Sequence, residues 1–215
     1  MSMNISTITV GPFAMNCYLV GDTNTRQAII IDPGAESEKL IKKIERENWQ
    51  LLSIVNTHCH IDHAAEAAKI QKYFQVPFYI HQQEMPMLQM LPEQGKLFGI
   101  TVEEIAQPSF LQEGDKLNIG SLSGTVLFTP GHTAGGISLL FGKHVFVGDC
   151  LFQDSIGRTD LVGGNYEQSI DSIKNKLLRL TDETKVYSGH GPVTTIGRER
   201  KYNPFLNTPP YRGQS

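Results

Sequence analysis

Five of the seven histidines in this chain fall in three short segments whose residue types suit the binding of metal ions. Neutral imidazole is the commonest side-chain ligand for zinc-like ions, and carboxylate oxygen is also accepted. The first segment holds four such side chains within six residues: His58, His60, Asp62 and His63. Three later positions add further candidates: His132, Asp149 and His190. Seven ligands are too many for one ion, so the sequence predicts a site for two.

The spacing of these residues indicates how they divide between the two ions. His58 and His60 are two positions apart, so in an extended chain both side chains point the same way. A division that uses every ligand once or twice gives one ion three histidines: His58, His60 and His132. The other takes the side chains that begin the next helix, with the last histidine: Asp62, His63 and His190. Asp149 is expected to bridge the two ions, which leaves positions open for water and substrate, as a catalytic site requires.

Two divalent ions held in this way support hydrolysis. A bound metal lowers the pKa of water to about 7, and two ions roughly 3.5–4 Å apart hold the resulting hydroxide between them. Asp62 can orient this metal-bridging hydroxide while bound to one ion, which makes it the expected catalytic residue. The mixed nitrogen and carboxylate ligands suit zinc, the first expectation, and also iron and manganese. No serine or cysteine nucleophile is then needed, and three cysteines are interpreted as buried packing residues: Cys17, Cys59 and Cys150.

Two histidines fall outside the ligand segments. His81 follows an apolar run and is expected to reach the rim of the pocket at most. His144 follows Gly142 and Lys143, a predicted hairpin turn, and is expected to be solvated. Neither is counted among the metal ligands.

The elements that must position these residues are short apolar strands that alternate with helical stretches. The predicted strands are Ile5–Val10, Cys17–Gly21, Ala28–Ile31, Leu52–Thr57, Pro77–Ile80, Lys116–Ile119, Thr125–Thr129, Ile137–Phe141, His144–Val147 and Lys185–Ser188. The predicted helices are Ser37–Glu47, Ala64–Phe74, Glu84–Met90 and Tyr166–Thr181. Each ligand segment closely follows an apolar run, and residues just past the carboxyl ends of strands converge on one edge in layered α/β folds. Glycines before His132, Asp149 and His190 allow tight turns there.

This order of elements predicts an α/β sandwich with mixed sheets rather than a parallel Rossmann sheet. The 215 residues suit a single domain, 1–215, because no low-complexity linker or clear repeat divides them. The segment Leu91–Gln112 is expected to be a long surface loop. The tail 203–215, rich in proline, glycine and polar residues, is expected to be irregular at its end.

Composition excludes several classes of partner. The net charge is −3 and no run of lysine or arginine forms a patch, which argues against binding of nucleic acid or anionic membranes. No segment approaches the roughly 18 apolar residues of a membrane span, and no signal peptide is evident. The three cysteines are an odd number and lie far apart, so a reducing cytoplasm is the expected location. The oligomeric state is left open.

The His58–His63 segment resembles the HxHxDH signature of the metallo-β-lactamase superfamily, and the later ligands match that family in order and context. The chain looks most like the glyoxalase-II-like branch, closest to its short single-domain bacterial members. Four stretches carry the finer match: Asn16-Cys17-Tyr18-Leu19, Pro130-Gly131-His132-Thr133, Gly148-Asp149-Cys150-Leu151-Phe152 and Gly157-Arg158-Thr159-Asp160. The resemblance implies an αββα sandwich with two metals at one sheet edge. It also implies hydrolysis of a small acyl thioester such as S-lactoylglutathione, by a hydroxyacylglutathione hydrolase type of thioesterase.

Arg158 is the expected substrate-binding residue. Similar glyoxalase II enzymes place a lysine and a tyrosine in this loop, against the glutathione moiety; here Arg158 stands at the lysine's place and Asp160 at the tyrosine's. An arginine holds a carboxylate through two hydrogen bonds. The alternative is a structural arginine paired with Asp160 or Asp154. Two-domain enzymes of this type add a C-terminal helical domain that completes the glutathione site. This chain ends shortly after His190, so weaker glutathione recognition is expected.

Other reactions stay open at this stage. Mononuclear iron persulfide dioxygenases look similar and also carry a Gly-Arg-Thr-Asp loop, and lactonases or β-lactamases share the superfamily. An RNA-processing nuclease is disfavoured by the lack of a basic patch. A non-catalytic, metal-stabilised binding module would fill every coordination position with protein ligands, whereas this set leaves room for water.

Overall fold

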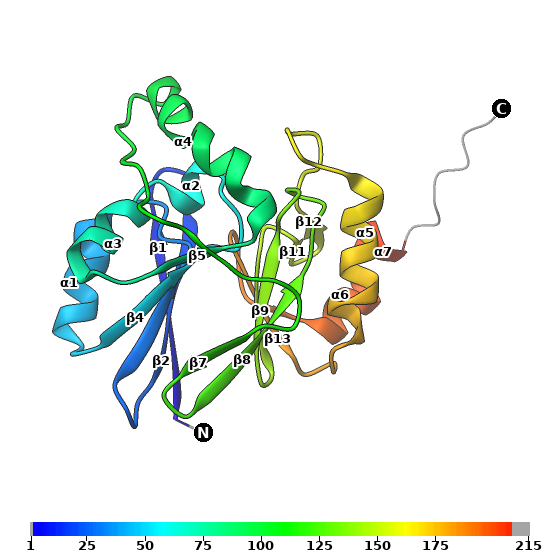
Figure 1. The fold of residues 1–215 in the computed structure, drawn as a ribbon. Helices are drawn as coiled ribbons and strands as arrows, with labels where there is room; N and C mark the ends of the chain where they lie inside the picture. The colour runs from blue at the N-terminus through cyan, green and yellow to red at the C-terminus, as the bar shows by residue number, and fades with distance from the viewer. Residues whose placement is uncertain (1, 208–215) are drawn as a thin grey trace.

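Two six-stranded β-sheets pack face to face between outer layers of helices in the computed structural model, which describes residues 2–207 (Figure 1). The first sheet has the order β1-β2-β3-β4-β5-β6 and the second the order β14-β13-β10-β9-β8-β7. Both contain parallel and antiparallel neighbours. This arrangement confirms the αββα sandwich of two mixed sheets expected from the sequence.

The first sheet consists of β1 (Met3–Val10), β2 (Met15–Asp22), β3 (Gln27–Ile31), β4 (Gln50–Val55), β5 (Phe78–Ile80) and β6 (Ser109–Phe110). Successive side chains of a strand point to opposite faces, so each central strand supplies two cores. Ile30 packs with Leu40 and Ile70 beneath the outer helices, whereas Ile29 and Ile31 face the second sheet. The covering helices are α1 (Ser37–Arg46), α3 (Ala67–Phe74) and α4 (Met85–Leu97).

The second sheet consists of β7 (Lys116–Ile119), β8 (Leu122–Phe128), β9 (Ile137–Phe141), β10 (His144–Gly148), β13 (Lys185–Ser188) and β14 (Thr194–Thr195). Val145 and Val147 of β10 pack against Ile173, Leu177 and Ile196 of the outer layer. That layer is built from α5 (Tyr166–Asn175), the 3₁₀ turn η2 (Leu177–Arg179), α6 (Ile196–Tyr202) and α7 (Pro204–Asn207). A small hairpin, β11 (Leu151–Phe152) and β12 (Ser155–Ile156), follows β10.

The expected surface loop Leu91–Gln112 is wrong over its first part, because α4 continues to Leu97. Pro92 lies inside this helix, yet Leu88 and Leu91 are buried in the core and hold it in place. Tertiary packing therefore outweighs the proline penalty. The helix expected over Ala64–Phe74 is divided, with a short α2 (Ile61–Ala64) before α3, and the helix expected to reach Thr181 ends at Asn175.

The C-terminal tail splits between described and undescribed residues. Residues 204–207 form α7, whereas 208–215 lie outside the described residues. No helix within residues 2–207 is both long and apolar enough to cross a membrane.

Candidate metal centre

The segments that follow β4, β8, β10 and β13 meet at one edge of the sandwich, where α2 and the β11–β12 hairpin also lie (Figure 1). Two of the three predicted turn glycines have the left-handed backbone that favours glycine, with φ of 133° at Gly131 and 51° at Gly148. Gly189 is needed for space instead, since a Cβ there would lie 2.2 Å from Asp149 Oδ1. The turns thus deliver their side chains into a shared volume.

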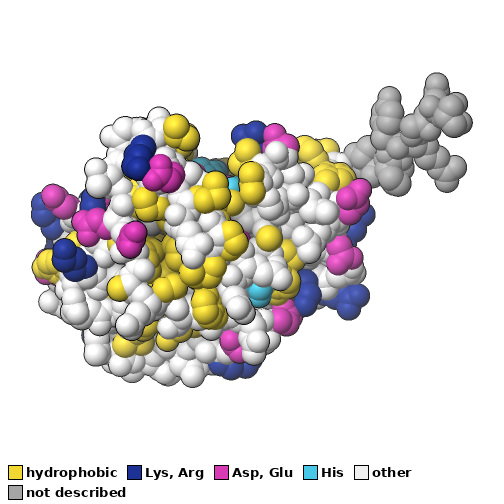
Figure 2. Space-filling view, turned by 45° about the horizontal axis from the view of Figure 1, so that its top comes forward, with side chains coloured by type: hydrophobic (Ala, Val, Ile, Leu, Met, Phe, Trp, Pro, Cys, Tyr) yellow, Lys and Arg dark blue, Asp and Glu magenta, His cyan; other side chains and the backbone are white. Residues whose placement is uncertain are grey.

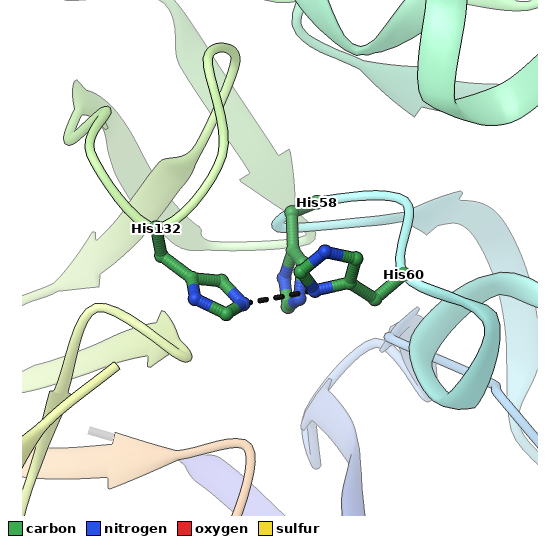
Figure 3. Close-up of side chains that lie close together, drawn as sticks. All are labelled: His58, His60 and His132. Atoms are coloured by element: carbon green, nitrogen blue, oxygen red, sulfur yellow. Dashed lines mark hydrogen bonds between the residues drawn. The ribbon is translucent and has the colours of Figure 1, made fainter. Parts of the chain in front are cut away.

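His58, His60 and His132 converge as the first group of potential ligands (Figure 3). One nitrogen of each lies within 4.8 Å of the others. The rings of His58 and His132 are 4.8 Å apart, and Nδ1 of His60 lies 2.9 Å from Nε2 of His132. These are the three histidines that the sequence assigned to one ion.

Asp62, His63 and His190 form the second group, again with one donor atom each within 4.8 Å of the others. Oδ2 of Asp62 lies 3.1 Å from Nε2 of His190 and 3.8 Å from Nε2 of His63. Asp62 and His63 belong to the short helix α2, and His190 follows β13. The grouping matches the second ligand set predicted from the sequence.

Asp149 lies between the two groups. Its Oδ1 is 3.4 Å from Nε2 of His63, whereas its Oδ2 is 3.8 Å from Nε2 of His132 and 3.6 Å from Nε2 of His190. One carboxylate therefore faces both groups, which is the position that a bridging ligand needs.

Hydrogen bonds at the opposite ring nitrogen fix how several of these histidines point. Nδ1 of His132 lies 2.7 Å from the carbonyl oxygen of Arg158, and Nδ1 of His190 lies 3.1 Å from that of Phe13. A carbonyl oxygen only accepts, so each Nδ1 must donate, and in the neutral ring the lone pair is then on Nε2, toward the centre. Nδ1 of His58 similarly lies 3.1 Å from the hydroxyl of Thr57. Such outer partners orient metal-binding histidines.

Asp32 is a supporting residue that the sequence reasoning missed. Its buried carboxylate binds Nδ1 of His63 at 3.0 Å and accepts hydrogen bonds from the backbone N–H and the hydroxyl of Thr57, at 2.7 and 2.6 Å. One of its oxygens also lies within 4.8 Å of nitrogens of His58 and His63. Because its oxygens already accept these hydrogen bonds, we interpret Asp32 as a support for the ligands. The signal was present, since Asp32 directly follows the apolar strand β3.

Glu84 is a second missed residue, and it joins two of the site loops. Its Oε2 accepts from the backbone N–H of Cys59, and its Oε1 accepts from that of Gly135, both at 2.8 Å. Burial raises the pKa of this carboxyl group, and it is 1% exposed. No sequence pattern marks Glu84, because its two partners are backbone groups from distant segments.

The electrostatics differ between the two groups. Burial lowers the pKa of His58 well below its usual value, lowers that of His60 to about 4, and also lowers that of His132. At neutral pH these rings are uncharged, as metal ligands must be. Burial opposes protonation of His63, but Asp149 and Asp32 raise its pKa overall. The hydrogen bond to Asp62 raises the pKa of His190.

The donor set fits divalent cations. Four of its buried polar atoms have no hydrogen-bond partner among the described residues: Nε2 of His58, Nε2 of His60, Nε2 of His63 and Oδ1 of Asp149. An unpaired buried polar atom is costly, and coordination to a cation would remove the cost. Within residues 2–207, neither Asp62 nor Asp149 forms an ion pair with lysine or arginine. Figure 2 shows histidine side chains recessed in a hollow of the surface, with hydrophobic side chains beside it.

The two remaining histidines lie apart from these groups. His81 stacks on Phe128 with ring centres 4.3 Å apart, and its Nδ1 accepts from the backbone N–H of Gln83. His144, expected to be solvated, is partly so: it is half-buried, and its Nδ1 lies 2.9 Å from the hydroxyl of Tyr187.

Arg158 is exposed and forms two 2.8 Å hydrogen bonds with Asp160, whereas Asp154 pairs with Arg198. Arg158 is thus paired with Asp160, as expected if it is a structural arginine. The three cysteines are buried and unpaired, in agreement with their interpretation as packing residues.

The chain is similar in sequence and in structure to known proteins. The profile described as "Metallo-beta-lactamase superfamily" matches residues 10–190. Hydroxyacylglutathione hydrolase GloC of Haemophilus influenzae is 41% identical over 211 residues, covering 96% of this chain and 99% of that protein. The crystal structure of the BLEG-1 B3 metallo-beta-lactamase is 39% identical with a TM-score of 0.87, covering 95% of this chain and 100% of that one. TTHA1623 in a di-iron-bound form is 36% identical with a TM-score of 0.85, covering 94% and 100%. Since the profile match runs from the end of β1 to His190, the chain belongs to the metallo-beta-lactamase superfamily.

Proposed function

We propose that this chain is a binuclear metallohydrolase that cleaves small acyl thioesters, with S-lactoylglutathione as the first substrate to test. One observation carries the proposal: two groups of three ligands lie on either side of Asp149, and several of their buried donor atoms have no other partner. The relative named as a hydroxyacylglutathione hydrolase supports this choice of substrate class. The proposed ligands are His58, His60, Asp62, His63, His132, Asp149 and His190.

The chain's own residues account for the remaining requirements of hydrolysis. When bound, divalent ions would supply an activated water at neutral pH and polarise the substrate carbonyl. Asp62 is 20% exposed, so its carboxylate can accept a hydrogen bond from the attacking water and hold it toward the carbonyl carbon. A thiolate leaves without a strong general acid, which fits a site whose first three histidines are neutral.

Zinc is the proposed metal, with iron or manganese as alternatives. Imidazole and carboxylate ligands suit all three, so the ligand set alone does not choose among them. The similar structure in a di-iron-bound form supports iron as the first alternative. We further propose a reducing, cytoplasmic setting, which the three buried, unpaired cysteines support.

Arg158 is proposed to bind a carboxylate of the glutathione part. Its carbonyl oxygen holds Nδ1 of His132, so the loop that carries the guanidinium adjoins the first ligand group. The side chain is 61% exposed and its partner Asp160 is also exposed. Exchange of Asp160 for a substrate carboxylate would therefore keep both hydrogen bonds of the guanidinium.

A second candidate function is oxidation of a persulfide by dioxygen, with a single iron ion at the site. The Gly157–Asp160 loop favours it, since similar dioxygenases carry the same four residues. Protein purified without chelators or added metal should be analysed for metal, then assayed for hydrolysis of S-lactoylglutathione and for oxygen uptake with glutathione persulfide. Two ions per chain with thioester hydrolysis supports our proposal. One iron with oxygen uptake would replace it, and hydrolysis of only a lactone or β-lactam would change the substrate class.

A further inference from the structure

A cavity of about 540 Å³ lies directly against the candidate metal centre. Asp62 forms part of its wall, so the cavity and the second ligand group share a residue. Most of the remaining wall is apolar and comes from four separate segments: the turn between β1 and β2, the loop between β3 and α1, helix α2 with the residues just after it, and the segment after α4. This volume falls in the range of sites for small organic ligands.

Two phenylalanines from distant parts of the chain line the cavity and contact each other. Phe13 belongs to the β1–β2 turn and Phe98 follows α4, and their rings meet edge to face with centres 5.9 Å apart. The carbonyl oxygen of Phe13 also holds Nδ1 of His190. The cavity and the second ligand group therefore share Phe13 as a neighbour.

The charges of the cavity decide which end of a thioester fits. Its charged lining residues are three acids: Asp62, Glu36 and Glu66. Glu36 accepts from the backbone N–H of Gly11 at 2.9 Å and pairs with Lys39, whereas Glu66 pairs with Lys69. In the part of the chain that the structure describes, the lining holds no lysine or arginine that would pair with the two carboxylates of a glutathione moiety. Arg158 instead adjoins His132, in the other ligand group.

We infer that this cavity binds the acyl group of the substrate and selects uncharged, unbranched apolar chains longer than lactoyl. The inference rests on the proposed thioesterase function and adds the direction in which the substrate lies. The acyl chain points past Asp62 toward Ile61 and Ile100, and the thiol part points toward Arg158. Apolar walls reward each added methylene group, because it leaves water.

The test uses one thiol and a series of acyl groups. S-acetyl-, S-butyryl- and S-hexanoylglutathione are compared with the zinc-loaded protein, and kcat/KM should rise by roughly 2- to 4-fold for each added methylene. Ile100→Asp places a charge on the cavity wall and should lower the hexanoyl-to-acetyl ratio toward one. Leu97→Asp is the matched control, because Leu97 is 85% exposed in the same segment and does not line the cavity. Its ratio should equal that of the wild type.

A binding measurement separates this inference from the proposed function. Hexanamide is uncharged and is not a thioester, so its binding can be followed through the methyl NMR signals of Ile61 and Ile100 without turnover. Hexanamide should shift both signals and acetamide should not, with the effect lost at Ile61 in Ile100→Asp. If hexanamide shifts both signals but no thioester is hydrolysed, the proposed function is overturned while the cavity still binds apolar chains. The inference that the cavity binds the acyl group would be overturned if hexanamide shifted neither methyl signal. It would also be overturned if kcat/KM did not change with the length of the acyl chain.

Discussion

Substitution of Asp32 by asparagine should weaken metal binding at the second ligand group. The effect should act through His63, a candidate ligand that the substitution leaves in place. Oδ1 of Asp32 accepts the backbone N–H of Thr57, which cannot change, so the amide oxygen of asparagine must stay there. The amide nitrogen then faces Nδ1 of His63, which donates to the carboxylate in the wild type. Two donors cannot share that contact. His63 is therefore expected to move its proton from Nδ1 to Nε2, the atom that faces Asp62 and Asp149.

The expected magnitude follows from that change of tautomer. Loss of an outer carboxylate partner of a metal-binding histidine typically costs about 10- to 100-fold in metal affinity. This equals about 1.4–2.7 kcal/mol, close to the roughly 1.5–3 kcal/mol for a hydrogen bond to a charged group. The loss should fall on the ion bound by Asp62, His63 and His190. The ion bound by His58, His60 and His132 should be affected less, since Asp32 accepts no hydrogen bond directly from those rings and reaches His58 only through the hydroxyl of Thr57.

Competition with a chromophoric chelator measures the two zinc affinities, and ¹⁵N NMR of the histidine rings reports the tautomer of His63 directly. Asp22→Asn is the matched control. Asp22 is equally buried and accepts hydrogen bonds from Ser2, Asn24 and Ser121 at the far end of β2. The Asp22→Asn variant should be less stable than the wild type but should bind both zinc ions with unchanged affinity. If Asp32→Asn binds both ions like the wild type, or keeps the proton of His63 on Nδ1, the reasoning fails.

Four further predictions use simpler measurements. Fully loaded protein should contain two transition-metal ions per chain by elemental analysis; a value that stays at one under saturating metal contradicts the binuclear site. Asp62→Asn should keep the circular dichroism spectrum but lose most hydrolytic activity, because the amide cannot replace the charge or the metal affinity; near-normal turnover would remove Asp62 from the mechanism. Arg158→Ala should raise KM more than it lowers kcat, with roughly 10- to 100-fold in kcat/KM at stake for a charge-assisted contact; an unchanged KM returns Arg158 to a purely structural role. Glu84→Gln should lower the free energy of unfolding by about 1–3 kcal/mol in urea, since glutamine cannot accept both backbone N–H groups; the exposed Glu93→Gln is its control, and equal stability of the two variants would show that Glu84 does not join the loops.

The sequence could indicate which side chains gather at this edge, because their signal is local. Four lie within six residues, and the others directly follow apolar strands whose carboxyl ends meet at one edge. The structure brings together the same two groups of three side chains that the sequence analysis allotted to two ions. The central strands were also predictable, since runs such as Ile29–Ile31 must supply both cores of a sandwich.

What the sequence did not reveal depends on contacts between distant segments. Leu91 and Pro92 looked like the start of a loop, but burial of Leu91 carries α4 through the proline. The strands β6, β11, β12 and β14 have two residues each, too few for any periodicity. The cavity next to Asp62 combines Phe13 with Phe98 and Ile100, which lie 85 or more positions along the chain.

Asp32 and Glu84, the two carboxylates that the sequence analysis missed, have different roles at the site. Strand ends bring the seven candidate ligands close, but they do not choose which nitrogen of a ring points inward. Asp32 makes that choice for His63, and it also holds Thr57, the neighbour of His58. Glu84 acts one level further out, because its bonds to Cys59 and Gly135 tie the loop of His58 and His60 to the loop of His132. A carboxylate that binds the backbone of two loops fixes those loops, whereas one that binds a ring fixes a tautomer. Their loss should therefore be distinguishable, as lower stability for Glu84 and as weaker binding of one ion for Asp32.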